Sequence, residues 1–536
     1  MRSVLAALKG AVRTVHLLLW DTAFHTDDVH LLQPEARDNL QADLDDDDNE
    51  YTSLSEYLSK TWRVVQTPSW LNFGRTHLET PGERTPHFRY AAHSEIYRIP
   101  NVDSDGTPLE PGEAAWHERE WLKDALPTYD SMRIESRIAF LPDMADVAVA
   151  FNDDYFLLRP LAVSDFHSPL YGSILRFKHD NERITTELNP QFFGTDGDQR
   201  YPVVPRPYLL HVPKVITQSL QVEATLMFSK MSTLSASKRF RELPIGHGDL
   251  QSQWLQIALR TERWREAMLW TWVVAKLGGA NGSLGQAERE QVGRLLGKTP
   301  GTNGSVEVVR GPRETLKHIE TNFAHAGWDN PKNTEYVWSS LDGHLPMTGK
   351  KTADPVENAK CTIDLEKCFD TFWTEGQTTA AHMFKHLAFR HPKCGDCLLM
   401  ALVTASDATY TIPKTASPPP YIAPPHLPMT PTWDEADFSL SKALAKTALP
   451  GDKVPLRQWT MHLLSRYLYT YGKSDVVFTQ LRTPESAADQ FASLDLDEEP
   501  SVLCLNDDIE RNYNEVLELV GTWFEKRWPN KAGWER

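Results

Sequence analysis

The stretch Val147-Ala-Val-Ala-Phe151 runs directly into Asn152-Asp-Asp-Tyr-Phe156. Its consecutive apolar residues, followed by polar turn formers, predict a short buried strand. Outward from this strand, the spacing of apolar residues predicts a helix over 132–141, and near the start of the chain a helix over 3–12 and a strand over 15–20. Helices that alternate with short apolar strands indicate an α/β fold, whose ligand site lies beyond the carboxyl ends of its strands.

The strongest helical pattern lies over residues 251–277, where apolar side chains recur every three or four positions before Gly278-Gly279. This pattern predicts a long core helix that ends at the glycine pair. Further helices are expected over 438–446, 455–471 and 508–528. The proline-rich stretch from 413 to 431, which precedes these three helices, predicts an extended linker that crosses the surface.

The composition is that of a folded, acidic protein. Its 536 residues include 56 Lys and Arg against 73 Asp and Glu, which gives a formal charge of −17, and 40 % of them are apolar. A core of ordinary size is therefore expected, and a wholly disordered or fibrous chain is excluded. The acidic balance also excludes a broad nucleic-acid-binding surface, because such a surface needs clustered Lys and Arg.

The acids at the end of the 147–151 strand carry the first chemical signal. Adjacent Asp153 and Asp154, with the amide before them, offer the hard oxygen ligands that hold Mg²⁺ or Mn²⁺ on a diphosphate. The same residues are also compatible with an Asx turn that caps the strand. Cys504-Leu-Asn-Asp-Asp-Ile509 repeats the triplet after a second apolar run, which favours the functional interpretation.

A second group of polar residues lies between the two triplets. His211 stands in Tyr208-Leu-Leu-His-Val-Pro213, a strand or turn that would hold its imidazole rigidly. Lys238-Arg-Phe-Arg241 and Gly248-Asp-Leu-Gln251 follow at the start of the long helix. Arginine suits phosphate and histidine suits proton transfer near neutral pH. Taken alone, however, a single histidine is more often structural, and a run of basic residues is usually a solvated face.

Four of the five cysteines form a separate pattern. Cys361 and Cys368 are followed by Cys394 and Cys397, and this spacing is compatible with a four-ligand zinc site. It is equally compatible with two disulfides, which we favour because the first spacing is long for zinc. In either case Cys504 is left as a free thiol, and the other four cysteines lie outside the catalytic chemistry.

The order of these motifs resembles the Stealth family of sugar-phosphate transferases, which includes bacterial capsule polymerases and fungal xylosylphosphotransferases. Three of the family's conserved blocks have counterparts over residues 2–8, 68–72, 93–97, 126–131, 134–136, 151–156, 165–166, 211–213, 240–241, 249–251 and 504–509. The resemblance covers 1–260 and 501–536, while 300–500 is similar only to the central region of fungal members. Two features depart from the family pattern. Asp130 stands where the family usually has Asn or Ser, and a long insertion covers residues 22–60.

The resemblance implies a specific reaction. A hydroxyl of a mannose-containing acceptor glycan attacks the β-phosphate of a UDP-sugar, UMP leaves, and a phosphodiester forms. His211 is then the general base and Arg241 the clamp on the transferred phosphate. Asp154 either binds metal or acts as an alternative base, and Asp153 and Asp508 complete the Mg²⁺ or Mn²⁺ site. Further residues that would bind donor or acceptor are Asn152, Asp249, Gln251, Thr128, Ser131, Glu135, Asn506 and Asp507.

The resemblance also implies an architecture. We expect a Rossmann-like mixed sheet flanked by helices, similar to that of type A glycosyltransferases. A catalytic domain would cover residues 1–290 and a largely helical insertion 291–500, and a C-terminal block over 501–536 would return to the active site. The family's first block, a nucleotide-binding strand, is missing from the sequence. We expect that block and a membrane anchor to be encoded upstream of Met1.

The expected location is the lumen of the Golgi or secretory pathway, where the substrates would be a nucleotide sugar and a mannose-containing glycan or glycoprotein. Two other functions fit the same residues. An ordinary glycosyltransferase would place paired acids at a strand end but release UDP. A homologue that lacks the first block would bind glycans without efficient catalysis.

Overall fold

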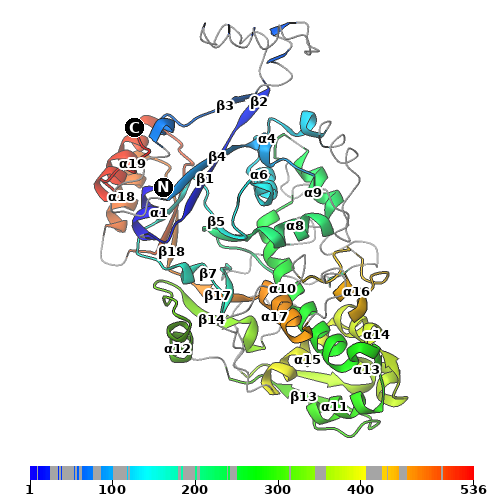
Figure 1. Cartoon of the computed structure of the whole chain (residues 1–536). Helices are drawn as coiled ribbons and strands as arrows, with labels where there is room; N and C mark the ends of the chain where they lie inside the picture. Colours follow the sequence, from blue (N-terminus) through cyan, green and yellow to red (C-terminus); the bar gives the residue numbers. More distant parts are fainter. Residues whose placement is uncertain are drawn as a thin grey trace.

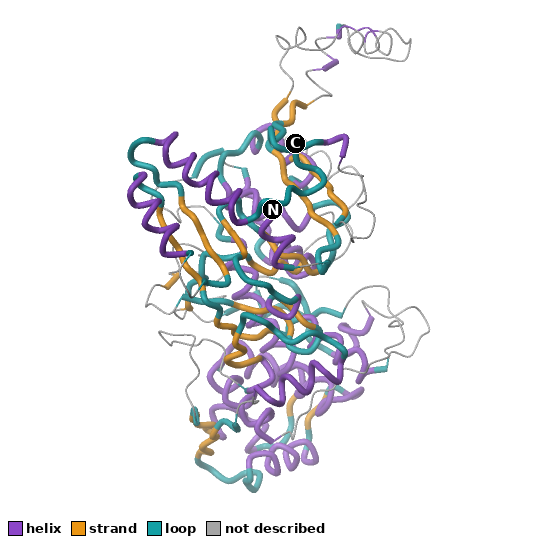
Figure 2. The backbone as a smooth tube through the Cα atoms, turned by 90° about the vertical axis from the view of Figure 1, so that its left-hand side faces the viewer, coloured by secondary structure: helices purple, strands orange, loops and turns teal. Residues whose placement is uncertain are grey.

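The computed structural model divides into an upper part rich in strands and a lower part made mainly of helices (Figures 1 and 2). Helix α10 (Ser252–Trp270) runs from the first part into the second. The structure describes residues 1–8, 10–23, 63–75, 86–99, 121–178, 206–237, 239–241, 250–312, 316–343, 358–405, 425–430, 432–445, 455–495 and 499–536, together with a few shorter pieces.

The two chain ends pack together at the edge of the upper part (Figure 1). Helix α1 (Arg2–Ala7) precedes strand β1 (Thr14–Leu19), which pairs in parallel with β4 (His87–Ala92). Arg2 donates to Glu535 at 2.6 Å, and Phe88 of β4 packs on Trp534. Two short strands, β2 (Asp21–Ala23) and β3 (Arg63–Val65), pair beyond β1, and α4 (His93–Ile96) follows β4.

A three-stranded sheet joins the C-terminal segment to the middle of the chain. Strand β19 (Val502–Asn506) lies between β18 (Val476–Gln480), which is parallel to it, and β6 (Tyr155–Leu157), which is antiparallel. Helices α18 (Pro484–Leu494) and α19 (Tyr513–Arg527) cover one face, where Leu503 and Leu505 pack against Phe491 and Trp523. The alternate residues of β19 therefore face the other side of the sheet.

Strand β5 (Val147–Ala150) precedes β6 and pairs with β11 (Lys214–Thr217) in antiparallel fashion. The predicted strand over 147–151 is thus confirmed. Next to this pair lie helices α6 (Ser131–Arg137), α8 (Gln218–Met227) and α9 (Ser229–Ala236). Helix α9 packs against α6 and α8, and both of these pack against α10. Gln256 of α10 accepts a hydrogen bond from Thr217 N at 2.8 Å, so α10 fixes the end of β11.

The largest described sheet has the order β14-β17-β8-β7. Its strands are β14 (Glu335–Ser339), β17 (Tyr469–Lys473), β8 (Gly172–Leu175) and β7 (His167–Ser168). Within the region 291–500, β17 thus pairs with β8 and β14 with β17, and β18 joins the sheet of the C-terminal segment. The domain limits inferred from the sequence stay a prediction.

The lower part is held by a large apolar cluster and two disulfides. Cys361 is bonded to Cys397 and Cys368 to Cys394, which fastens α15 (Pro392–Ala405) to β15 (Lys360–Asp364) and α13 (Leu365–Thr374). The zinc alternative is therefore wrong, because every one of the four sulfurs is used in a disulfide. Further elements are α11 (Gln286–Leu296), β13 (Ser305–Val309), α12 (Leu316–Ala326), α14 (Ala380–Lys385), α16 (Leu440–Ala445) and α17 (Leu456–Arg466), with the short pair β12 (Ser283–Leu284) and β16 (Thr378–Thr379).

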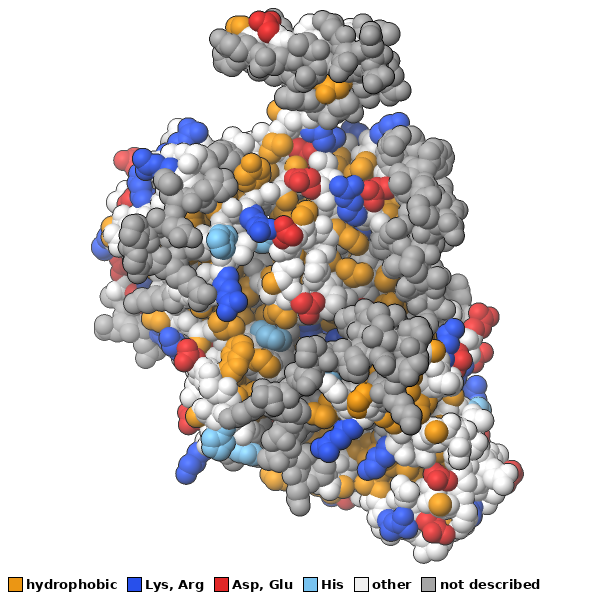
Figure 3. All heavy atoms as spheres, in the orientation of Figure 1, with side chains coloured by type: hydrophobic (Ala, Val, Ile, Leu, Met, Phe, Trp, Pro, Cys, Tyr) orange, Lys and Arg blue, Asp and Glu red, His pale blue; other side chains and the backbone are white. Residues whose placement is uncertain are grey.

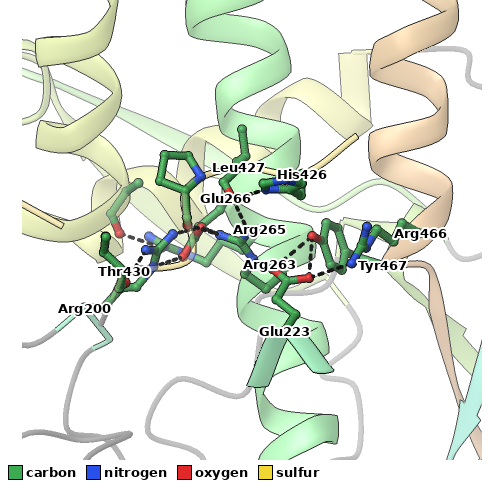
Figure 4. Close-up of polar contacts among 12 residues, drawn as sticks. Arg200, Glu223, Arg263, Arg265, Glu266, His426, Leu427, Thr430, Arg466 and Tyr467 are labelled. Atoms are coloured by element: carbon green, nitrogen blue, oxygen red, sulfur yellow. Dashed lines mark hydrogen bonds and ion pairs between the residues drawn. The ribbon is translucent and has the colours of Figure 1, made fainter. Parts of the chain in front are cut away.

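Helix α10 is buried on all sides although it carries several charges (Figure 4). Arg263 donates to both Glu223 and Glu266, and Glu266 also accepts from Arg200 at 2.7 Å. Burial works to raise the pKa of Glu266, but the charges of Arg200 and Arg263 outweigh it and lower the pKa. Each buried charge is therefore compensated by an opposite charge or by carbonyl groups, such as that of Thr430.

The α/β class expected from the sequence is confirmed, and the predicted helix over 251–277 is present as α10 and a π-helical turn (Thr271–Gly278). The described strands form separate sheets of two to four strands. The finer expectation of one Rossmann-like sheet stays a prediction. Most of the proline-rich linker lies outside the described residues. Among the described helices, none is both long and apolar enough to cross a lipid bilayer.

Candidate active site

The first Asn-Asp-Asp triplet forms the turn between β5 and β6, and His211 lies immediately before β11. Because β11 pairs with β5, the histidine is brought to the end of β5 that carries the acids. His211 Nε2 lies 3.0 Å from Oδ2 of Asp154. The side chain of His211 is 46 % exposed and that of Asp154 24 %. The structure thus joins two of the predicted catalytic residues into one pair that is open to solvent.

Strand β19 brings a buried thiol to the same carboxylate. Cys504 is opposite Tyr155 in the β19–β6 pair, and its Sγ lies 3.1 Å from Oδ2 of Asp154 and donates to it. Burial works to raise the pKa of Asp154, but the hydrogen bonds from His211 and Cys504 outweigh it and lower the pKa. Burial and the adjacent Asp154 in turn raise the pKa of Cys504. Asp154 is therefore a carboxylate near neutral pH, and Cys504 a thiol that donates to it.

A second pair of residues holds the other side of the imidazole. The hydroxyl of Tyr155 lies 3.2 Å from His211 Nδ1, and Lys214 Nζ donates to the same hydroxyl at 3.3 Å. A protonated lysine cannot accept a hydrogen bond, so the tyrosine proton points to Nδ1. His211 then carries its own proton on Nε2 and donates to Asp154. All hydrogen bonds in this chain are therefore compatible with a single arrangement of protons.

Arg241 is held by the loop before α6. Its Nη2 donates to Ser131 Oγ at 2.9 Å, and its Nε lies 3.7 Å from Oδ1 of buried Asp130. Arg133, also buried, donates to Asp130 at 2.7 Å and to the carbonyl of Phe240 at 3.1 Å. This ion pair anchors the backbone next to Arg241. The guanidinium, whose side chain is 43 % exposed, is thus fixed without being covered.

Glu135 links the two groups of residues. Burial raises the pKa of this carboxyl, and the positive charges of Lys214 and Arg241 oppose that effect. Lys214 and Arg241, which come from different parts of the chain, therefore both act on the charge of Glu135. Tyr129 and Phe240, two exposed rings stacked at 5.2 Å, stand beside Arg241.

Of the other predicted site residues, some lie near the Asp154–His211 pair, and others make contacts that stabilise the fold. Leu505 N donates to Asp154 O at 2.9 Å, so the second triplet begins beside the first. Asn506 Nδ2 donates to Asp508 at 3.1 Å. Gln251 caps α10 through Trp254 N and donates to Tyr208. Asp153 and Asp507 are exposed, Asn152 is half-buried, and Thr128 is buried and accepts from Asp130 N. Asp249 lies outside the described residues.

The residues present fit a divalent cation in part. Asp154 Oδ1 is buried and has no hydrogen-bond partner among the described residues, and exposed Asp153 follows the same strand. These carboxylates suit Mg²⁺ or Mn²⁺, which take oxygen ligands and the oxygens of a bound diphosphate. Asp508 accepts from Gln480 at 2.8 Å as well as from Asn506. The ligand atoms that converge among the described residues are those of Asp154, His211 and Cys504.

The sequence analysis missed the residues that support His211. Lys214 carried no sequence signal, because its role depends on the pairing of β11 with β5. Tyr155 and Cys504 both belong to the quoted motifs, but their contacts with His211 and Asp154 depend on the pairing of β6 with β19 and of β5 with β11. On the face drawn in Figure 3, described Lys and Arg side chains are scattered among Asp and Glu.

Comparison with known proteins places this site in a family. Residues 496–536 match the model of Stealth protein CR4, conserved region 4. A 3-O-alpha-D-mannopyranosyl-alpha-D-mannopyranose xylosylphosphotransferase of Cryptococcus neoformans serotype D is 42 % identical over the whole chain and 72 % of its own length. The enzyme of the same name from the variety grubii is similar to the same extent. An exopolysaccharide phosphotransferase of Streptomyces coelicolor is 25 % identical over 33 % of this chain and 28 % of its own. The chain belongs to the Stealth family and is a phosphotransferase enzyme.

Proposed function

We propose that the protein transfers a sugar 1-phosphate from a UDP-sugar to a hydroxyl of a mannose-containing glycan and releases UMP. The observation that carries the proposal is the Asp154–His211 pair, whose side chains are 24 % and 46 % exposed and therefore open to solvent. The names of the relatives support xylose 1-phosphate as the transferred group and a mannosyl-mannose as the acceptor.

In the proposed reaction, the acceptor oxygen forms a bond to the β-phosphorus as the bond from that phosphorus to the bridging oxygen breaks. The carboxylate of Asp154, held by the hydrogen bond from His211 Nε2, takes the proton of the hydroxyl, and UMP leaves with the bond electrons. Arg241 binds the non-bridging oxygens, where negative charge must be stabilised in the transition state. Asp153 and Oδ1 of Asp154 would hold Mg²⁺ or Mn²⁺, which offsets the charge of the diphosphate.

The test is to identify the nucleotide product. Purified protein is incubated with UDP-xylose, Mn²⁺ and α-1,3-linked mannobiose, and the nucleotides are separated by anion-exchange chromatography. We expect UMP to accumulate together with a product that contains a phosphodiester between two sugars. Accumulation of UDP would refute phosphate transfer and identify a glycosyltransferase. Mannobiose binding without any nucleotide product would instead identify a glycan-binding homologue.

We further propose that the enzyme works in the lumen of the secretory pathway, in the Golgi. The two disulfides of the lower part support an oxidising compartment, because such bonds are rare in proteins of the cytosol. Microscopy of the tagged full-length protein with a Golgi marker tests this location. Diffuse cytosolic signal would refute it.

A further inference from the structure

Phe478 is an exposed aromatic residue in the middle of strand β18. Half of its surface, 50 %, is open to solvent, whereas Thr479 next to it is buried. Aromatic side chains are among the residues most often buried when they have no role at the surface, since their exposure to water is unfavourable. The position of this ring in the sheet indicates what it could contact.

Three strands place Phe478 in one row with two residues of the active site. Phe478 is directly opposite Cys504, and Cys504 is directly opposite Tyr155. Residues that are opposite one another in paired strands project from the same face of the sheet. The neighbours Val477, Leu503 and Phe156 pack with the apolar cluster under α18 and α19. The row Phe478–Cys504–Tyr155 therefore faces away from these helices.

Every member of this row contacts the catalytic pair. Tyr155 bonds to His211, and Cys504 bonds to Asp154. The ring of Phe478 lies 6.0 Å from that of His211, at an interplanar angle of 72°. Tyr155 and Cys504 are buried, whereas Phe478 is the exposed end of the row. Phe478 thus presents an apolar surface to solvent directly beside His211.

We propose that Phe478 is the platform on which the acceptor sugar of the glycan stacks, so that its hydroxyl reaches the Asp154–His211 pair. The inference rests on the proposed function and identifies its acceptor subsite. A pyranose has a face of C–H groups that packs on an aromatic ring, whose π face is negative. A diphosphate, in contrast, requires cations, and Arg241 supplies one. The uncharged ring therefore suits the acceptor and Arg241 the donor.

The experiment separates acceptor from donor binding. Transfer is measured for Phe478→Ala and Phe478→Tyr at varied mannobiose and at varied UDP-xylose. We expect Phe478→Ala to raise the acceptor KM about tenfold, the size of a lost aromatic contact, with the donor KM within about twofold. Phe478→Tyr should restore the acceptor KM, because it keeps the ring. Trp328→Ala, which removes an exposed aromatic residue after α12, is the matched control and should change neither value.

Two results would overturn the inference. The first is an acceptor KM of Phe478→Ala that stays at the wild-type value. The second is a rise of the donor KM alone, which would assign the ring to the donor sugar. If the wild-type protein releases no UMP, the proposed function fails, and calorimetry with mannobiose tests the platform separately. Weaker binding by Phe478→Ala, restored by Phe478→Tyr, would then support the platform. Equal affinities of the wild type and Phe478→Ala would refute it.

Discussion

Removing one hydroxyl group tests how His211 is aligned. The hydroxyl of Tyr155 donates to His211 Nδ1 at 3.2 Å and accepts from Lys214 at 3.3 Å. The net free energy of one such bond, about 1–1.5 kcal/mol, corresponds to roughly a tenfold change in rate. The lost alignment adds to this, because a positioned general base contributes on the order of 10²- to 10⁴-fold. We therefore expect Tyr155→Phe to lower kcat by about 10- to 100-fold, with both KM values close to wild type.

The assay compares this variant with a second tyrosine that loses an equivalent bond elsewhere. Tyr336 is buried and donates to the carbonyl of Ser164 at 2.7 Å. Tyr336→Phe should lower the thermal stability about as much as Tyr155→Phe but leave kcat unchanged. Initial rates at saturating donor and acceptor, together with melting curves, distinguish catalytic from structural loss.

A double-mutant cycle then tests whether the hydroxyl acts through the imidazole. In a background of His211→Ala, Tyr155→Phe should have little further effect on kcat, because its partner is already absent. The reasoning is refuted if Tyr155→Phe lowers kcat by the same factor with and without His211. It is also refuted if Tyr155→Phe alone has the kcat of the wild type.

Substitutions at the active site and in the buried ion pairs of α10 test the remaining roles. His211→Ala and Arg241→Ala should each lower kcat by orders of magnitude with unchanged circular dichroism, and near-normal rates in folded protein would contradict their roles. Asp154→Asn should alter the dependence of the rate on Mn²⁺, whereas an identical metal titration would remove this residue from the metal site. Glu223→Gln should cost about 3–5 kcal/mol of unfolding free energy, against about 1 kcal/mol or less for the exposed control Glu307→Gln. Burial works to raise the pKa of Glu223, but nearby arginines outweigh it and lower the pKa below the ordinary value of 4.5. Urea titrations should therefore show the stabilising contribution of Glu223 in full above pH 4.5. This contribution should be lost as the pH falls further and Glu223 becomes protonated.

Local patterns predicted the elements that carry the site. The apolar run over 147–151 is β5, and the helical spacing over 251–277 is α10 with its π-helical end. The helix expected over 508–528 is observed as α19. These elements are specified by neighbouring residues, so their periodicity is visible in the sequence. The turn that follows β5 likewise presents Asp154 as its motif suggests.

Contacts between distant parts of the chain could not be predicted in the same way. The sequence predicts a core helix over 251–277, but it does not show which groups compensate its charges. Arg263 and Glu266 are buried with Glu223 and Arg200, which lie far away in the sequence. The role of Lys214 likewise depends on strand pairing. The four linked cysteines left two chemistries open until their distances were known.

A buried arginine of α10 connects the helical part to the strand that follows His211. Arg260 of α10 donates to the carbonyl groups of Arg466 and Leu468, which lie just before β17, and also contacts Thr217 Oγ1. Thr217 is the last residue of β11. This strand begins at Lys214, three residues after His211. A shift of α10 would therefore move β11 along β5 and change the distance from His211 to Asp154. Because the hydrogen bonds of a buried guanidinium are directional and costly to break, they fix the position of β11 more strictly than apolar packing alone would.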